Sequence, residues 1–129
     1  MTLIIEPMTW PEVVAFYNGL AYDSAWEIGP MLEMVESLAA SPYAEHLYPA
    51  TSMARLCLGR VRPLRFGYEM VIVEYVSTDP HFSFEYHEAA NLPTPWTVKC
   101  EASAGLARLE RILTRRLRWL NGSHFEAND

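Results

Sequence analysis

Three residues of the types used in metal binding and acid–base catalysis fall within one short segment, at His81, Glu85 and His87. In an extended strand, alternate side chains leave the same face about 7 Å apart, so Glu85 and His87 could chelate one metal ion. Imidazole and carboxylate are ligands for zinc, iron or manganese. The same residues could instead act as general acid and base, because histidine titrates near neutral pH.

Neither chemistry is completed by the rest of the sequence. No fourth metal ligand is evident, and Ser83 has no Gly-x-Ser-x-Gly elbow around it. The chain also lacks a phosphate-binding Gly-rich loop, paired zinc-binding cysteines, a His-Glu-x-x-His motif and a dinucleotide fingerprint. We therefore expect no metal, no other cofactor and no catalytic residue, with a water-facing polar strand as the simpler interpretation of the three residues.

Arginines recur near the C-terminus at intervals of three, four and three residues, at Arg108, Arg111, Arg115 and Arg118. This spacing puts them on one face of a helix, where guanidinium groups could grip carboxylates or phosphates. The face could also pair with acidic helices of the same chain or of a second copy. The remaining interpretation is a solvated helix surface, and the sequence leaves all three open.

Negative charge is concentrated in the first part of the chain. Residues 1–50 contain seven acids and no Lys or Arg, and the net charge of the whole chain is −6. Such a balance disfavours nucleic-acid binding. Tyrosine and tryptophan, which often anchor interfaces, lie among these acids. We expect a protein-binding surface formed by Glu12, Tyr22, Asp23, Trp26, Glu27, Glu33 and Glu36.

Two helices are expected to carry this surface. Thr9 and Glu12 form a capping-box pattern that starts a helix ending near Asn18-Gly19. For the second helix two forms are open: one kinked helix over 24–40, or a turn followed by a helix that begins at Pro30, which we favour slightly. In both forms the apolar stripe includes Met31 and Val35.

A β-rich middle and a last helix follow. We expect strands over 53–61, 66–76, 81–88 and 96–101, the third with Phe82, Phe84 and Tyr86 on one face. Leucines repeat at helical spacing from residue 106 to residue 120, and Asn121-Gly122 is expected to end that helix.

These elements predict one α+β domain over residues 1–122. It has a four-stranded antiparallel meander, with two N-terminal helices and one C-terminal helix packed on the sheet. Residues 123–129 are expected to be a loose tail. Cys57 and Cys100 are too few for a disulfide framework and are expected to be reduced core thiols. With no signal peptide and no apolar run of about 20 residues, we expect a cytoplasmic protein that does not enter membranes.

The leading functional prediction is a non-enzymatic module that binds another protein bearing a basic surface. In general character, the chain is similar to small acidic bacterial inhibitors, immunity proteins among them. One alternative is a small enzyme or a ligand-binding or metal-binding domain, with its site over His81, Glu85 and His87. The other is a structural homo-oligomer, such as a homodimer, in which the arginine face of one copy meets the acidic helices of the next.

Overall fold

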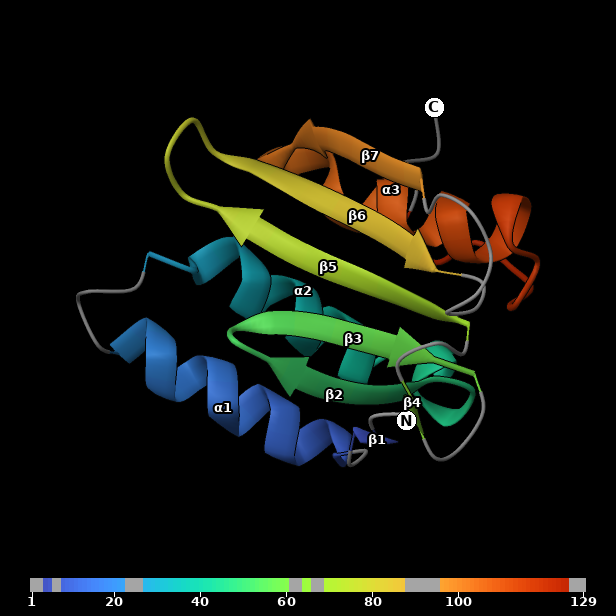
Figure 1. The fold of residues 1–129 in the computed structure, drawn as a ribbon, viewed down its shortest axis with the longest axis horizontal. Coiled ribbons are helices and arrows are strands. Elements are labelled where there is room, and N and C mark those ends of the chain that lie inside the picture. Colours follow the sequence, from blue (N-terminus) through green and yellow to red (C-terminus); the bar gives the residue numbers. More distant parts are fainter. Residues whose placement is uncertain are drawn as a thin grey trace.

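The structure is a computed structural model that describes residues 4–5, 8–22, 27–60, 64–65, 69–87 and 96–125. It has the expected α+β class, with an antiparallel sheet backed by helices (Figure 1). The five strands of the main sheet lie side by side in the same order in which they occur along the chain. The expected meander is therefore confirmed in kind, but it has five strands and not four.

The main sheet comprises β2 (Tyr48–Ser52), β3 (Arg55–Gly59), β5 (Met70–Val76), β6 (His81–His87) and β7 (Trp96–Glu101). A separate two-stranded sheet pairs β1 (Ile4–Ile5) with β4 (Leu64–Arg65). The helical segments are α1 (Trp10–Tyr22), α2 (Gly29–Ala39), the 3-10 turns η1 (Pro42–Glu45) and η2 (Ala102–Ala104), α3 (Gly105–Arg111) and the π-helical segment η3 (Ile112–Arg116).

Helix α1 begins as the capping box predicts. The amide of Thr9 donates to Oε1 of Glu12 (2.9 Å), and the amide of Glu12 donates to the Thr9 hydroxyl (3.3 Å). The Thr9 amide thereby holds the pKa of Glu12 below its usual value. The helix continues through Gly19 to Tyr22, past its expected end, because Leu20 and Ala21 pack against the core. That packing outweighs the helix-breaking tendency of one glycine, about 1 kcal/mol.

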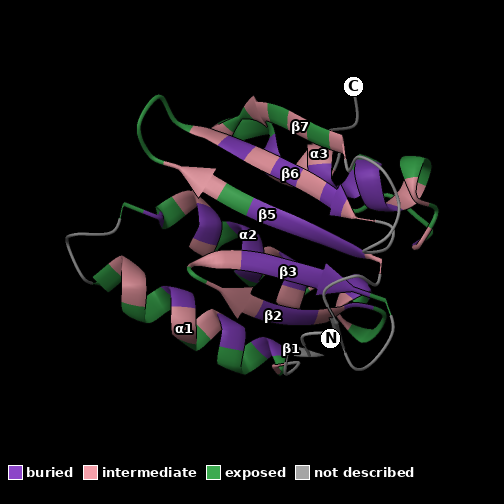
Figure 2. Ribbon diagram, in the orientation of Figure 1, coloured by how far each residue is buried: buried purple, intermediate pink, exposed green. Residues whose placement is uncertain are grey.

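Strand β6 divides its side chains between two faces, as its alternating sequence predicts. Phe82, Phe84 and Tyr86 are buried in the core shared with the helices, while the residues between them are only half-buried (Figure 2). The neighbouring β5 is apolar on both faces: Val71 and Val73 join the same core, and Met70 and Ile72 form a second cluster with Ala50 and Cys57. β5 accordingly lies at the centre of the sheet order, with β3 on one side and β6 on the other.

The C-terminal helix differs from its expected form. Leu109, Leu113 and Leu120 are buried as predicted, but the α-helix ends at Arg111 and a π-helical segment follows. The Thr114 hydroxyl donates to the Glu110 carbonyl (2.7 Å), a side-chain bond that competes with regular helical pairing. The chain then leaves the helix at Arg118, whose φ is +57°. The ending expected at Asn121-Gly122 is therefore wrong, although the leucine stripe still faces the core.

Among the described residues, Glu110 is the one charged residue that is buried, with 2% of its surface exposed. Its carboxylate accepts hydrogen bonds from the Tyr43 hydroxyl (2.7 Å), the Ser123 hydroxyl (3.3 Å) and the amides of His124 (2.5 Å) and Phe125 (3.1 Å). All four partners are donors, as an ionised carboxylate requires. Residues 123–125 therefore contact the Glu110 carboxylate, whereas residues 126–129 lie outside the described part of the chain. The loose tail expected over residues 123–129 stays a prediction. Within the described residues, no helix is long and apolar enough to cross a bilayer.

Helix α3 approaches β6 closely because residue 105 is glycine. A Cβ placed on Gly105 would lie 2.3 Å from the Phe82 ring, whereas one placed on Gly19 in α1 would meet nothing within 4 Å. Replacing glycine with alanine is therefore expected to lower the stability of the protein at position 105 and to raise it at position 19.

We predict that Gly105→Ala lowers the free energy of unfolding by about 1–3 kcal/mol, because the added methyl group overpacks the core. Gly19→Ala should raise it by about 0.5–1 kcal/mol, since alanine loses less conformational entropy in a helix. Urea unfolding of both variants measures the two effects. Equal stability of the two variants would show that α3 and β6 are not in close contact at this point.

Candidate functional site

His81, Glu85 and His87 lie on β6, on the sheet face turned away from the helices. Glu85 and His87 are brought together, with Oε1 and Nε2 2.5 Å apart. His81 is six residues before His87, which is roughly 20 Å along an extended strand. Its Nδ1 lies 2.9 Å from the Asp79 carbonyl. Across the described residues, no group of three His, Cys, Asp or Glu side chains could hold a metal ion. An enzyme or ligand site over this face stays a prediction.

Both cysteines are free thiols. Burial raises the pKa of Cys57 to about 11, and burial also raises the pKa of the half-buried Cys100. At neutral pH both thiols are therefore protonated, and a protonated thiol is a poor nucleophile and a poor metal ligand.

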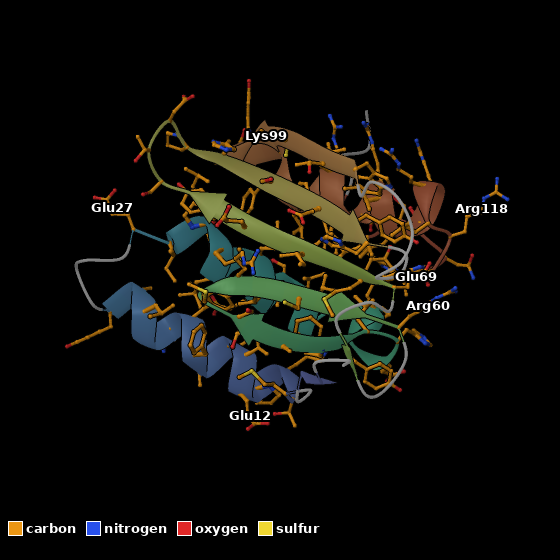
Figure 3. The ribbon with its side chains drawn as sticks, viewed as in Figure 1. Glu12, Glu27, Arg60, Glu69, Lys99 and Arg118 are labelled. Carbon is orange, nitrogen blue, oxygen red and sulfur yellow. The ribbon has the colours of Figure 1, made fainter. Side chains whose placement is uncertain are left out.

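The residues expected to form an acidic surface are spread over two helices. Glu12 and Tyr22 lie near opposite ends of α1, roughly 15 Å apart along the axis of an ideal helix. Glu27 is exposed just before α2, while Glu33 and Glu36 are exposed within α2. Figure 3 shows Glu12 and Glu27 far apart on the molecule. Asp23 and Trp26 lie outside the described residues. The structure therefore places Tyr22 and Glu27 near one end of the molecule, whereas Glu12 lies away from that end, at the start of α1.

Several connections meet at that end of the molecule, on the left in Figure 1. They are the end of α1, the start of α2, the turn between β2 and β3, and the turn between β5 and β6. A hollow of about 400 Å³ is lined by residues from the start of α2, the β2–β3 turn and the β5–β6 turn. Its wall includes the carboxylates of Glu27 and Glu74, the guanidinium of Arg55, and the side chains of Ile28, Met31 and Met53.

The turn between β2 and β3 has an unusual composition for its shape. Ser52 pairs with Arg55, so Met53 and Ala54 form a two-residue loop. Their φ angles are +52° and +68°, the sign required at both positions of a type I′ turn. Asparagine and glycine usually occupy these positions, because glycine has no Cβ and the short asparagine side chain can hydrogen-bond locally. Most other residues cost roughly 1–2 kcal/mol in a left-handed conformation. The Tyr17 hydroxyl donates to the Ala54 carbonyl (3.0 Å) and helps to hold the loop in place.

Met53 and Tyr22 are the exposed large hydrophobic residues of the described chain, with 92% and 94% of their surfaces accessible. Tyr22 ends α1 and Met53 lies in the β2–β3 turn, and both of these elements reach the end of the molecule that is on the left in Figure 1. We call Tyr22, Glu27, Met53 and Glu74 the hairpin-end surface. Two of its members, Met53 and Glu74, are absent from the surface predicted from sequence. Met53 was placed inside a strand, because Met-Ala carries no hairpin signal, and Glu74 lies on a strand beyond the acidic N-terminal segment.

The arginines expected on one helix face are mostly brought together. Arg108, Arg111 and Arg115 line a shallow groove of about 300 Å³, together with Arg116, Val98 and Ile112. Arg118 is exposed and follows the π-helical segment, and it does not line the groove. The guanidinium of Arg116 lies 3.8 Å from the centre of the Trp96 ring.

Comparison with protein-family models, with curated proteins and with solved structures finds nothing that matches this chain. Fold and surface chemistry therefore carry the functional argument.

We predict that the double substitution Met53→Asn with Ala54→Gly raises the free energy of unfolding by about 1–2 kcal/mol, because both residues suit left-handed backbone angles. Chemical denaturation measures the change. Met53→Leu is the control: leucine is no better suited than methionine to a left-handed conformation, so this variant should leave stability within about 0.5 kcal/mol of the wild type. A double variant that is no more stable than the wild type would argue against strain in this loop.

Proposed function

We propose that this protein is a non-enzymatic, cytoplasmic module that binds another protein through the hairpin-end surface. One observation carries the proposal. The exposed large hydrophobic residues of the described chain are Tyr22, at the end of α1, and Met53, on the wall of the hollow that acids border; both elements reach the same end of the molecule. Exposed apolar side chains that gather at one place and have a polar rim are typical of interaction sites.

The strain at Met53 supports the same proposal. Folding alone would favour asparagine and glycine in the loop, since they form the turn at lower cost. Met53 is held in an unfavourable backbone conformation with its apolar side chain in water, so it does not stabilise the folded state. Strain of this kind is concentrated at functional sites. Met53 also suits contact with a protein, because the flexible thioether side chain adapts to an irregular surface.

The charges indicate which kind of partner fits. Three acidic residues are exposed at this end: Glu27, Glu74 and Asp79. Among the described residues that line the hollow, Arg55 is the one with a positive charge. The whole chain carries a net charge of −6. A partner with Lys or Arg side chains around an apolar pocket would therefore complement this surface, and long-range attraction would speed the encounter. An inhibitor of the immunity-protein type, which acts by covering a basic site, is the class that fits best.

The surface is tested by capture of proteins from extracts of the source cells on the immobilised chain, followed by titration of the main captured protein. We predict a basic protein whose binding weakens as salt is raised, since exposed charges are screened. Tyr22→Ser should weaken binding by at least about tenfold, or 1.4 kcal/mol, without lowering stability. The double variant of Met53 and Ala54 should bind as weakly, even though it is expected to be more stable than the wild type.

Paired charge removals provide the matched control. Glu27→Gln with Glu74→Gln should slow association, whereas Glu33→Gln with Glu36→Gln removes the same charge from α2, away from the hollow, and should have a smaller effect. Equal effects of the two pairs, together with unchanged binding of Tyr22→Ser, would contradict the hairpin-end surface. Such a result would favour the broader acidic surface expected from sequence.

A further inference from the structure

The groove that contains Arg108, Arg111, Arg115 and Arg116 runs between the last strand of the sheet and the C-terminal helix. It has a volume of about 300 Å³, and its apolar contacts come from Val98 on β7 and Ile112 at the start of the π-helical segment. The described residues that line it carry four positive charges and no negative charge. Arg111, Arg115 and Arg116 are exposed, and Arg108 is half-buried.

The groove borders a sheet edge that can accept another strand. β7 is the last strand in the sheet order, and among the described residues no strand pairs with its outer side. Such an edge presents backbone donors and acceptors to an extended peptide, which can add to the sheet as a further strand. The half-buried side chains of Trp96, Val98 and Cys100 point toward the helices. An added strand would alternate in the same way, with every second side chain facing the arginines.

The spacing of the arginines suits such a strand. Arg108 and Arg115 are seven residues apart, which is roughly 10 Å along an ideal helix axis, with Arg111 between them. Alternate side chains of an extended peptide are about 7 Å apart, so two or three successive inward-facing carboxylates would span the same length. The guanidinium fork can grip each carboxylate with two parallel hydrogen bonds.

The groove is less suited to a nucleic acid. Single-stranded nucleic acids bind through bases stacked on free aromatic faces, combined with positive charge. Trp96 is the aromatic residue beside the groove, and its ring already stacks with Tyr86 (5.2 Å between centres) and lies under Arg116. The net charge of −6 adds a general repulsion of polyphosphates that a short acidic peptide would feel less.

We infer that this groove binds an extended acidic segment of a partner protein, which adds to the edge of β7 and places its carboxylates against Arg108, Arg111 and Arg115. This binding surface is separate from the hairpin-end surface, so neither proposal depends on the other.

The probe is a fluorescein-labelled peptide of about ten residues that alternates Glu with Thr, so that all its carboxylates leave one side of an extended chain. Its binding is followed by fluorescence anisotropy at low salt. We expect saturable binding by the wild type, and at least tenfold weaker binding by Arg111→Glu with Arg115→Glu. The matched control, Arg55→Glu with Arg118→Glu, reverses the same charge outside the groove and off β7, and it should change affinity less than about twofold.

A second measurement keeps the test independent of any effect of these substitutions on folding. Titration of the unlabelled peptide into the isotope-labelled wild type should shift the amide signals of residues 96–101 on β7 and leave those of β2, the opposite edge, unchanged. The same peptide with Gln in place of Glu should produce neither shifts nor saturable binding.

Three results would overturn the inference. They are an absence of saturable peptide binding, an equal loss of affinity in the groove and control variants, and tighter binding of a labelled thymidine oligonucleotide of similar charge. The last result would identify a nucleic-acid groove. Self-association of the wild type that Arg111→Glu with Arg115→Glu abolishes, without peptide binding, would instead assign the groove to a second copy of this chain.

Discussion

The contact between the Phe82 ring and the backbone of Gly105 determines how closely α3 can lie against β6. No side chain separates the two elements there, since even a Cβ would come within 2.3 Å of the ring. At this separation Phe82 and Phe84 on β6 share one dry interior with Leu109 and Leu113 on the C-terminal helical segments, and all four are almost fully buried. Dense packing of this kind leaves little room for alternative arrangements.

The two surfaces that we propose lie away from the sheet face that the helices cover. The helices occupy the inner face, and on the outer face the apolar residues Ala50, Cys57, Met70 and Ile72 are buried among themselves and their neighbours. The remaining distinctive surfaces are an end where turns converge and an edge where the sheet stops. The first has exposed apolar residues with acids, and the second has arginines around an apolar floor. Their opposite charges would let the domain contact two partners of different character.

Sequence reasoning succeeded where local chemistry and tertiary packing agree. The capping box at Thr9 and the alternation through Phe82 and Phe84 both predict what the structure shows. It failed where a position departs from the usual residue preference. The β2–β3 hairpin was missed because Met53 and Ala54 occupy a turn that normally takes asparagine and glycine. The π-helical segment was missed because the leucine spacing before and after it resembles that of a continuous α-helix. Spacing along the chain also could not show that the end of α1, with Tyr22, and the β2–β3 turn, with Met53, lie toward the same end of the molecule. That placement depends on the tertiary fold.

The central functional claim is that a partner protein covers the hairpin end, and site-specific photo-crosslinking in the source cell tests it most directly. A benzophenone amino acid would replace Met53 in one variant and Ser83, on the outer face of β6, in another. We expect a covalent adduct with a basic protein from position 53 and none from position 83. An adduct from position 83 in the absence of one from position 53 would contradict the proposal and direct attention to the sheet face of Glu85 and His87.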